Sequence, residues 1–424
     1  MIWRLARLLL ALGLVTPVSV AAGTVEVPAG GGALEQALHA AEAGDILRLG
    51  PGRHTGGIEI AKPLTLMCRK GAEIDGGGQG SVLTVTTRAV EIRNCLIRGS
   101  GDDHQNIDSG VRLLKGANDA RVIGNRLIGN LYGVDIHGAR NALVAGNVIE
   151  GRQDHRMNDR GNGVYVWNAP GAEVTGNDIR WGRDGIFVNT SNDNTFTGNR
   201  FRDLRFAVHY MYANNSEVSG NLSIGNHLGY AVMYSRGVKV RNNISIRDGK
   251  HGIMLNYANS SEVTGNLVVK GREKCLFIYN AHKNEITGNR FEGCPTGVHF
   301  TAGSERNRIY RNAFLGNRTQ VKYVGSKWLD WSVDGTGNYW SDFAAYDLDG
   351  DGRADVPYRP NDSMDHVLWT QPAAKLLLGA PAVQLVKWAQ SAFPALLPGG
   401  VVDTAPMMKP VEIDRPQWER HHEG

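Results

Sequence analysis

The chain has 424 residues, and its 46 basic and 42 acidic residues leave a formal charge of only +4. Such a balance argues against a nucleic-acid-binding protein whose affinity depends on phosphate neutralisation. Glycine occurs 54 times, well above the usual share and without the strict triplet of collagen, which indicates an elongated, β-rich fold.

Residues 1–22 have the pattern of a secretory signal peptide. Arg4 and Arg7 precede an apolar run that begins at Leu8, and small residues end the segment at Ala22. An uncleaved anchor helix fits less well, because the apolar run is short for a membrane span. Cleavage before Gly23 removes two basic and no acidic residues, which leaves 44 basic and 42 acidic residues.

Residues 23–57 are expected to form an N-terminal cap. The segment from Ala33 to Ala43 has the spacing of a short amphipathic helix, and the segment from Asp45 to Leu49 that of a strand. A Pro51-Gly52 turn follows. A solenoid needs such a cap, since its terminal coil otherwise exposes the core.

From residue 110 to 315 the chain repeats every 22 or 23 residues. Each unit has an apolar residue three positions before an asparagine, and the asparagines are Asn125, Asn147, Asn177, Asn199, Asn221, Asn243, Asn266, Asn289 and Asn312. A block of glycine and alternating apolar residues, such as Gly133 to His137, lies upstream in the unit. Short strands with glycine and asparagine at the corners predict an all-β fold, a right-handed parallel β-helix over residues 58–325. Asparagines at one corner are expected to stack from coil to coil.

Four cysteines have spacings close to one coil within each pair: Cys68 with Cys95, and Cys275 with Cys294. In an oxidising compartment, neighbours on adjacent coils are expected to form two disulfides. A thiolate metal site is the weaker alternative, because no two cysteines are two or three residues apart.

Two polar insertions interrupt the coils, at Gly99 to Asp108 and at Gly151 to Asn162. They supply the candidate residues for an alternative function as a secreted lyase or epimerase of acidic polysaccharides. These candidates are Asp102, Asp103, His104 and Asp108 in the first insertion and Asp154, His155 and Asp159 in the second. The outward positions of the coils lack the dense array of arginines, lysines and paired aspartates that such an enzyme uses, so we favour a protein without catalytic activity.

In each glycine block the third and fifth residues are expected to point outward and to stack on the next coil. These residues form an outward strip rich in aromatic, histidine and methionine side chains: Arg112 and Leu114, Asp135 and His137, Tyr165 and Trp167, Phe187 and Asn189, His209 and Met211, Met233 and Ser235, Met254 and Asn256, Phe277 and Tyr279, His299 and Thr301. An ordinary solvent-exposed face has mostly charged and hydroxyl side chains.

The strip has three interpretations. The first is a docking surface for a partner protein, where methionine and aromatic residues are enriched. The second is a transient Cu(I) site made by His209, Met211, Met233 and Met254, since thioether and imidazole ligands suit Cu(I). The third is burial under the C-terminal segment. Docking and copper handling are compatible, because a metal passed between proteins crosses an interface.

Residues 326–366 are expected to form an aromatic and acidic C-terminal cap. Asp347, Asp349, Asp351 and Asp355 have the first, third, fifth and ninth positions of an EF-hand calcium loop, with Gly352 sixth, but the twelfth residue is Tyr358 instead of glutamate. A structural calcium site and an acidic turn explain the pattern equally well.

Residues 367–424 are expected to form short apolar helices and then a flexible tail from Pro398. Pro381 and Pro394 interrupt the helical spacing, and the segment is too polar to span a bilayer. It is expected to pack on the solenoid or to dock on a membrane-bound partner.

Together, the signal peptide, the coils of residues 110–315, the segment Gly337 to Asp342, the acidic loop behind it and the apolar helices resemble the NosD family. The resemblance implies a non-catalytic periplasmic accessory protein in the maturation of nitrous-oxide reductase, an enzyme of denitrification with a copper-sulfide centre. It also implies an ABC transporter partner (NosF as ATPase, NosY as membrane subunit), the copper lipoprotein NosL and the reductase NosZ. The apolar helices are expected to dock on NosY. The copper ligands are inferred from the residues alone.

Overall fold

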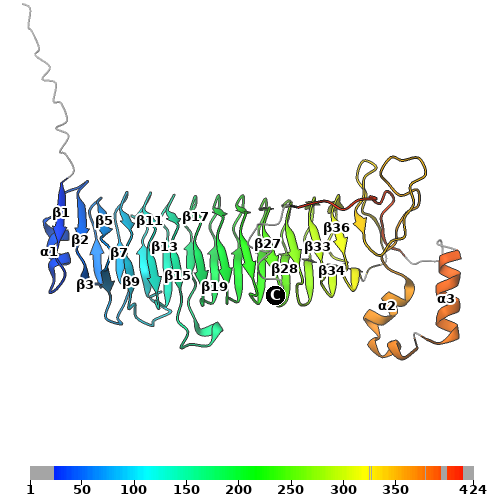
Figure 1. The fold of residues 1–424 in the computed structure, drawn as a ribbon, viewed down its shortest axis with the longest axis horizontal. Helices are drawn as coiled ribbons and strands as arrows, with labels where there is room; N and C mark the ends of the chain where they lie inside the picture. The colour runs from blue at the N-terminus through cyan, green and yellow to red at the C-terminus, as the bar shows by residue number, and fades with distance from the viewer. Residues whose placement is uncertain (1–22, 324, 326, 378, 393–398, 414–424) are drawn as a thin grey trace, which may run out of the picture.

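The computed structural model describes residues 23–323, 325, 327–377, 379–392 and 399–413, so the expected signal peptide lies outside the described residues. The fold is a long stack of coils, and successive coils add strands to three parallel sheets, A, B and C (Figure 1). The prediction of an all-β parallel solenoid is confirmed.

Sheet A has 13 strands, and their bounds are β1 (Thr24–Val27), β2 (Ile46–Leu49), β5 (Thr65–Cys68), β8 (Glu91–Arg93), β11 (Arg121–Ile123), β14 (Leu143–Ala145), β17 (Glu173–Thr175), β20 (Thr195–Thr197), β23 (Glu217–Ser219), β26 (Lys239–Arg241), β29 (Glu262–Thr264), β32 (Glu285–Thr287) and β35 (Arg308–Tyr310). Sheet B also has 13 strands, namely β3 (Gly52–Thr55), β6 (Ala72–Asp75), β9 (Leu96–Arg98), β12 (Arg126–Ile128), β15 (Val148–Glu150), β18 (Asp178–Arg180), β21 (Arg200–Arg202), β24 (Leu222–Ile224), β27 (Ile244–Ile246), β30 (Leu267–Val269), β33 (Arg290–Glu292), β36 (Ala313–Leu315) and β39 (Tyr339–Trp340).

Sheet C has 12 strands, and their bounds are β4 (Ile58–Ile60), β7 (Leu83–Val85), β10 (Ser109–Leu113), β13 (Tyr132–His137), β16 (Val164–Trp167), β19 (Asp184–Asn189), β22 (Phe206–Met211), β25 (Leu228–Met233), β28 (His251–Asn256), β31 (Lys274–Tyr279), β34 (Thr296–Phe300) and β37 (Thr319–Tyr323). A separate two-stranded sheet pairs β38 (Trp328–Asp330) with β40 (Gly400–Val402). The helices are α1 (Ala33–Ala40), α2 (Ser363–Thr370) and α3 (Pro381–Ala392), with 3-10 turns η1 (Met157–Asp159) and η2 (Pro372–Leu377).

The core of the solenoid consists of inward side chains stacked in register. Val134, Val164 and Ile186 lie opposite one another on successive strands of sheet C, and all three are fully buried. Each added coil therefore buries a further layer of apolar side chains, at about 25 cal/mol per Å² of apolar surface removed from water. The core is continuous along the stack, so stability is distributed between neighbouring coils.

The predicted asparagine ladder follows one corner of this core. The side-chain oxygen of Asn199 accepts a hydrogen bond from the backbone N–H of Asn177 at 3.0 Å. Its side-chain nitrogen donates to the carbonyl of Val174 at 2.8 Å. The same pattern recurs from Asn125 and ends at Asn338, where the side chains are buried. Each asparagine thus satisfies backbone groups that a buried corner leaves unpaired.

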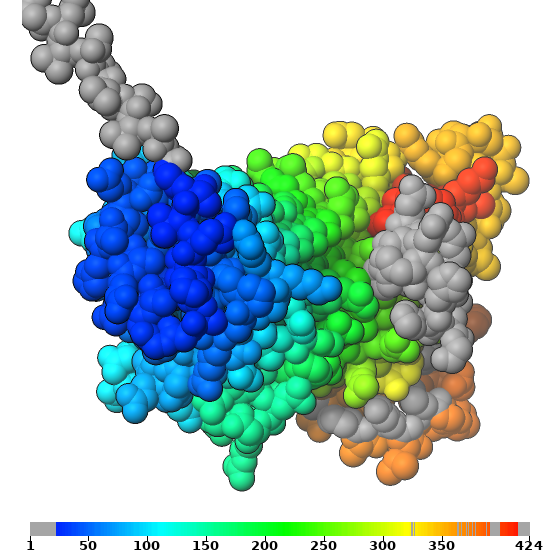
Figure 2. Space-filling model, turned by 60° about the vertical axis from the view of Figure 1, so that its left-hand side comes forward, coloured from blue at the N-terminus to red at the C-terminus, as the bar shows by residue number. Residues whose placement is uncertain are grey.

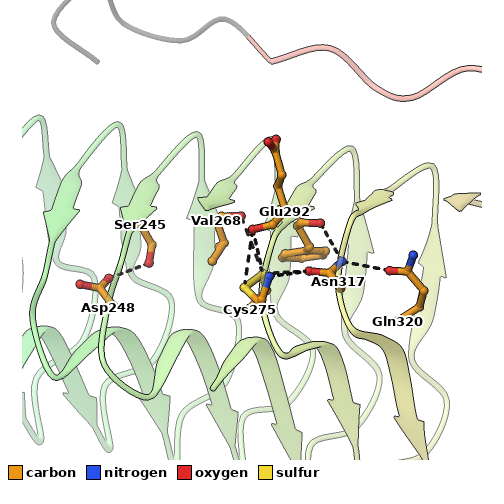
Figure 3. The surroundings of a disulfide bond; sticks show 9 residues. Ser245, Asp248, Val268, Cys275, Glu292, Asn317 and Gln320 are labelled. Atoms are coloured by element: carbon orange, nitrogen blue, oxygen red, sulfur yellow. Dashed lines mark hydrogen bonds between the residues drawn. A yellow bond between two sulfur atoms is a disulfide. The ribbon is translucent and has the colours of Figure 1, made fainter. Parts of the chain in front are cut away.

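Both predicted disulfides are present: Cys68 pairs with Cys95 and Cys275 with Cys294. All four cysteines are therefore bonded, which removes the alternative of a thiolate metal site. Figure 3 shows Cys275 inside the coils, near the side chain of Asn317 and the carbonyl of Val268. Each disulfide joins neighbouring coils and constrains the unfolded chain.

The N-terminal cap closes one end of the stack (Figure 2). Helix α1 buries Leu34 and Leu38 against the first strands. The helix was predicted to reach Ala43 but ends at Ala40, because Ala41 has an extended backbone (ψ 148°).

The other end is closed by residues that the sequence predicts to be a flexible tail. Strand β40 pairs in parallel with β38, and Asp403 is fully buried. The Asp403 carboxylate accepts hydrogen bonds from the Asn338 backbone N–H at 2.7 Å and from the Trp340 indole at 2.8 Å. The prediction is therefore wrong for residues 400–403, which complete the cap.

Helices α2 and α3 lie beyond this end of the solenoid (Figure 1). The turn η2 between them exposes Leu376, which is 91% accessible, and α3 exposes Leu385, which is 63% accessible. Among the described residues, no helix has the length and apolar character needed to cross a bilayer.

Candidate functional site

The outer face of sheet C has three columns of side chains. In strand β22 they are Phe206, His209 and Met211, whereas Val208 and Tyr210 point inward and are buried. Successive strands align residue by residue, so each outward side chain stacks on its equivalents in the neighbouring coils. The second and third columns form the outward strip, which extends from Arg112 to Thr301.

The structure corrects the position of Met233 in this strip. The sequence pattern placed Met233 in the second column and Ser235 in the third. The observed register aligns Met211 with Met233, and aligns His209 with Ala231 and then Met254. Ser235 is buried at the following corner, where its hydroxyl accepts from the Ala213 N–H. Counted from Gly229, Ala231 is the third residue and Met233 the fifth, so the glycine block gives the observed register. Pairing Met233 with Ser235 shifts the register by two residues, which keeps the same face.

Met211 and Met233 are therefore direct neighbours on adjacent strands. The backbones of such strands are about 4.8 Å apart, a separation at which two thioether sulfurs are able to approach one ion. Both side chains are partly exposed. Met254 lies in the second column, one strand beyond Ala231, so it is diagonal to Met233.

His209 lies beside this methionine pair with one ring nitrogen anchored. Its Nδ1 is 3.2 Å from Oδ2 of Asp184, a fully buried carboxylate. Arg205 donates two further hydrogen bonds to Asp184, at 2.8 and 2.7 Å. Burial opposes ionisation of Asp184, but the bonds from His209 and Arg205 outweigh it and lower the pKa of that carboxyl.

An ionised carboxylate only accepts hydrogen bonds, so the neutral His209 ring must carry its proton on Nδ1. The other ring nitrogen, Nε2, then keeps its lone pair. This atom is buried and has no hydrogen-bond partner among the residues that the structure describes. A histidine fixed by a carboxylate through one nitrogen and open at the other has the arrangement of metal-ligating histidines.

Aromatic rings enclose the imidazole. Phe206 stacks on it at 4.5 Å and Phe187 lies at 4.8 Å on the neighbouring strand. His209 is only 7% exposed as a result. The rings hold the imidazole in one orientation and exclude water from it, which suits a soft, weakly hydrated ion better than a hard one.

Two further histidines, His251 and His299, flank Phe277 on the same face, at 5.0 and 4.9 Å. Burial and the nearby Lys274 lower the pKa of His251 to about 4. Burial and the charge of Lys322 lower the pKa of His299 to about 4 as well. Both imidazoles are therefore neutral at neutral pH. His251 precedes the glycine of its block, so the sequence pattern did not place it on this face.

The N-terminal half of the strip is an aromatic stack. Trp167 stacks on His137 at 4.3 Å, and Tyr165 stacks on Phe187 at 5.5 Å. A hollow of about 820 Å³ beside His137 and Trp167 is also lined by Lys115 and Arg140. Buried Asp135 has a raised pKa because of desolvation, and its partner Arg112 lies 3.2 Å away.

The two insertions contact each other next to this stack. Arg152 and His155 of the second insertion bind Asp102 of the first, each at 3.1 Å. His104 lies 3.1 Å from the Tyr132 hydroxyl. The structure thus brings several of the enzymatic candidates together. Asp103 and Asp108 instead accept hydrogen bonds from backbone N–H groups of their own loop, and Asp154 pairs with His155.

The acidic loop brings three of its four predicted calcium ligands together. Carboxylate oxygens of Asp347, Asp349 and Asp355 lie within 4.8 Å of one another. Asp351 is not in this cluster, and its side chain accepts from the Arg353 N–H at 2.8 Å. Asp347 also accepts from the N–H groups of Gly350 and Gly352.

Known proteins similar to this chain identify its family. Residues 145–345, which include the Met211–Met233 pair, match the NosD family model, described as a periplasmic copper-binding protein. The chain is 44% identical over 382 residues to the probable ABC transporter binding protein NosD of Pseudomonas aeruginosa, covering 87% of this chain and 89% of that protein. The chain belongs to the NosD family. The NosD of Stutzerimonas stutzeri is 42% identical over 376 residues, covering 85% and 86%.

Solved structures similar to this NosD-family chain share its fold alone. An exopolygalacturonase of family 28 from Yersinia enterocolitica has a TM-score of 0.54 at 11% identity, covering 69% of this chain and 79% of the enzyme. A mannuronic-acid-specific family 6 lyase from human gut microbiota has a TM-score of 0.53 at 13% identity, covering 71% and 83%. The NosD relatives, by contrast, are named as binding proteins, which confirms the prediction that this chain is not an enzyme. The family description also agrees with the predicted periplasmic location.

Proposed function

We propose that this NosD-family chain is a periplasmic accessory protein that relays Cu(I) during maturation of the copper-sulfide centre of nitrous-oxide reductase. Cu(I) is the cargo in this proposal. His209 Nε2 and the thioethers of Met211 and Met233 are its ligands, and Met254 is an auxiliary ligand on the next coil. The supporting observation is the anchored His209 ring beside two methionines in register.

The ligand set favours transfer over storage. It contains no thiolate, since all four cysteines are in disulfides. Thioether and neutral imidazole bind Cu(I) without adding negative charge, so the ion is held less tightly than by thiolates. The methionines are partly exposed, which gives a second protein access to the ion. A site of this kind is suited to receive copper from NosL and present it to NosZ.

The names of the relatives support an ABC transporter as a partner. Relatives bear the name of ABC transporter binding proteins, and we propose that α2, η2 and α3 dock on the membrane subunit NosY of a NosF–NosY transporter. The exposed leucines of this segment support that proposal. The helices lie beyond the end of the solenoid, so the outward strip stays accessible to NosL and NosZ while the transporter is bound (Figure 1).

Anaerobic Cu(I) titration against a competing chelator tests the copper role. The mature protein is compared with a Met211→Leu, Met233→Leu, Met254→Leu variant and with a Met157→Leu control, whose methionine lies on the second insertion. Binding that is lost in the triple variant and kept in the control supports the relay. Equal or absent binding in all three proteins contradicts it and leaves a docking scaffold without a copper site.

A further inference from the structure

An exposed row of tyrosines borders the methionine pair. Its members are Tyr212, Tyr234, Tyr257 and Tyr279, whose accessible fractions are 51, 42, 41 and 40%. Tyr212 stacks on Tyr234 at 5.3 Å, and Tyr234 stacks on Tyr257 at 5.1 Å with an interplanar angle of 9°. Tyr279 completes the row at 5.9 Å with its edge toward Tyr257. We call these four residues the tyrosine ladder.

Three of the ladder residues have a backbone conformation that tyrosine seldom adopts. Tyr212, Tyr234 and Tyr257 have φ values of 53°, 48° and 51°, in the left-handed region. The same corner is occupied by Gly138 and Asn168 in earlier coils, residues that reach this region at lower cost. Tyrosine at these corners therefore opposes folding, and three in succession indicate a function outside the fold.

Exposure leads to the same conclusion. A ring that is about half accessible contributes little to the core, and four adjacent rings form one continuous apolar surface. Such a surface on a soluble protein indicates an interaction site, and tyrosine is enriched at protein interfaces. Tyr212, Tyr234 and Tyr257 stack on one another, so the faces between them are not available for stacking on sugar rings.

The charge near the ladder indicates the chemistry of the partner. The corner segments 212–216, 234–238, 257–261 and 280–284 contain no aspartate or glutamate. They contain Arg236 and Lys283, both exposed. A surface with acidic groups around an apolar centre complements this arrangement. A basic or purely polysaccharide ligand does not.

The ladder is also continuous with the proposed copper ligands. Tyr212 directly follows Met211, and Tyr234 directly follows Met233. A protein bound edge-on to the ladder thus covers the methionine pair. This arrangement shields Cu(I) from water and oxidants at the moment of transfer.

We propose that the tyrosine ladder is the docking edge for an acidic, Cu(I)-carrying protein that delivers its metal to Met211 and Met233. The inference rests on the proposed copper function, which it extends by naming the surface and the charge of the donor. Binding is expected to weaken as salt concentration rises, because Arg236 and Lys283 contribute charge complementarity at the rim.

The test compares wild type with a Tyr212→Asn, Tyr234→Asn, Tyr257→Asn variant. Asparagine tolerates the left-handed corner, so the variant is expected to melt at the same temperature as wild type or higher. Thr190→Asn is the matched control, since Thr190 (φ 53°) occupies the equivalent corner one coil before the ladder. The probe is the lipid-free domain of NosL from the same organism, loaded with Cu(I), and calorimetry measures its affinity.

The proposal predicts that the ladder variant binds the probe about ten-fold or more weakly, whereas Thr190→Asn binds normally. Unchanged affinity for the ladder variant overturns it. It is also overturned if light scattering detects a wild-type dimer that the ladder variant lacks, because the ladder is then a contact between copies of this chain.

Cu(I) titration of the same proteins distinguishes a failure of the docking edge from a failure of the copper function. A ladder variant that binds Cu(I) normally but not the probe supports the docking edge. If wild type binds the probe through the ladder but never binds Cu(I), the proposed copper function is wrong. The ladder is then still a docking edge, but delivery of Cu(I) to the methionines is overturned.

Discussion

Met211 and Met233 occupy equivalent positions on adjacent strands, directly opposite each other in the register of β22 and β25. Met254 is excluded from this pair, because its column contains His209 and Ala231 instead. A Met211→Leu, Met233→Leu variant is therefore expected to lose most of the Cu(I) affinity, whereas Met254→Leu loses little. Leucine keeps a similar volume, so folding is preserved. Chelator competition measures the Cu(I) affinity of both variants. An equal loss of affinity in the two variants contradicts the argument from the strand register.

Asp184 fixes the tautomer of His209, so the charge of Asp184 is expected to affect Cu(I) affinity although Asp184 is not itself a ligand. Asp184→Asn removes the carboxylate that anchors Nδ1 and leaves the orientation of the imidazole less defined, and Cu(I) affinity is expected to fall about 10- to 100-fold. Asp178→Asn is the control, since Asp178 pairs with Arg202 on sheet B, 3.2 Å away. Normal Cu(I) binding by Asp184→Asn refutes the role of His209 as a ligand.

Asp248 predicts a pH dependence of stability. It is fully buried, and Ser245 donates a hydrogen bond to it at 2.6 Å (Figure 3). Ser223 donates another at 2.7 Å. Burial raises its pKa to about 7. A carboxyl whose pKa is raised in the folded state favours folding at low pH, and its ionisation destabilises the protein as pH rises to about 7.

Asp248→Asn removes this ionisation, and an amide suits the position because Asn226 occupies it one coil earlier. Between pH 5 and 8 the variant is expected to gain about 2–3 kcal/mol in free energy of unfolding relative to wild type, at about 1.4 kcal/mol per pKa unit. Urea denaturation at the two pH values measures the change. A constant difference between the proteins shows that Asp248 does not titrate in this range.

The hypothesis that the acidic loop binds calcium can be tested with Asp351 as a control position in the same loop. Ca²⁺ at about 1–5 mM, the range for weak extracellular sites, is expected to raise the melting temperature of wild type. Asp347→Asn with Asp349→Asn is expected to abolish the shift. Asp351→Asn should retain it, because Asp351 lies outside the carboxylate cluster. Absence of a shift in wild type means that the loop is an acidic turn.

Docking through the C-terminal helices is best tested without truncation. Deletion after Trp369 also removes β40 and Asp403, which close the solenoid. Leu376→Gln, Leu377→Gln and Leu385→Gln together keep the cap and are expected to abolish co-purification with the membrane subunit. Leu348→Gln, an 85% exposed leucine on the acidic loop, is the control. Retained association of the triple variant contradicts docking by this segment.

The fold could be predicted because its determinants recur locally. Asn199 and its equivalents stand at one place in every unit, and each bonds to the coil before it, so one repeat describes them all. Disulfide pairing followed from the same period. The position of Met233 was contained in the same pattern, because Met233 is the fifth residue counted from Gly229. The pairing with Ser235 was wrong by two residues, a shift that conserves the face.

Most of the candidate site depends on contacts that no single unit shows. Asp184 lies 25 residues before His209 and precedes the glycine of its block, where the repeat gives no hint of an outward side chain. Tyr212 and Tyr234 occupy corners where the repeat predicts glycine or asparagine. This departure from the repeat was the sequence feature from which the tyrosine ladder could have been predicted. Asp403 bonds to Trp340 across 63 residues of irregular sequence.

The closing contact at Asp403 has a mechanical consequence. The backbones of Tyr358 and Asp403 form two hydrogen bonds of 2.9 Å with each other, so the chain leaves the cap and returns to it at one place. The helices α2 and α3 form a loop whose two ends meet there. A pull on that loop by the proposed membrane partner would act on Asp403 and on Trp340, which stacks on Phe314 at 4.4 Å. It would also act on the last strand of sheet C, because the Asn361 side chain donates a hydrogen bond to the Val321 carbonyl at 2.6 Å.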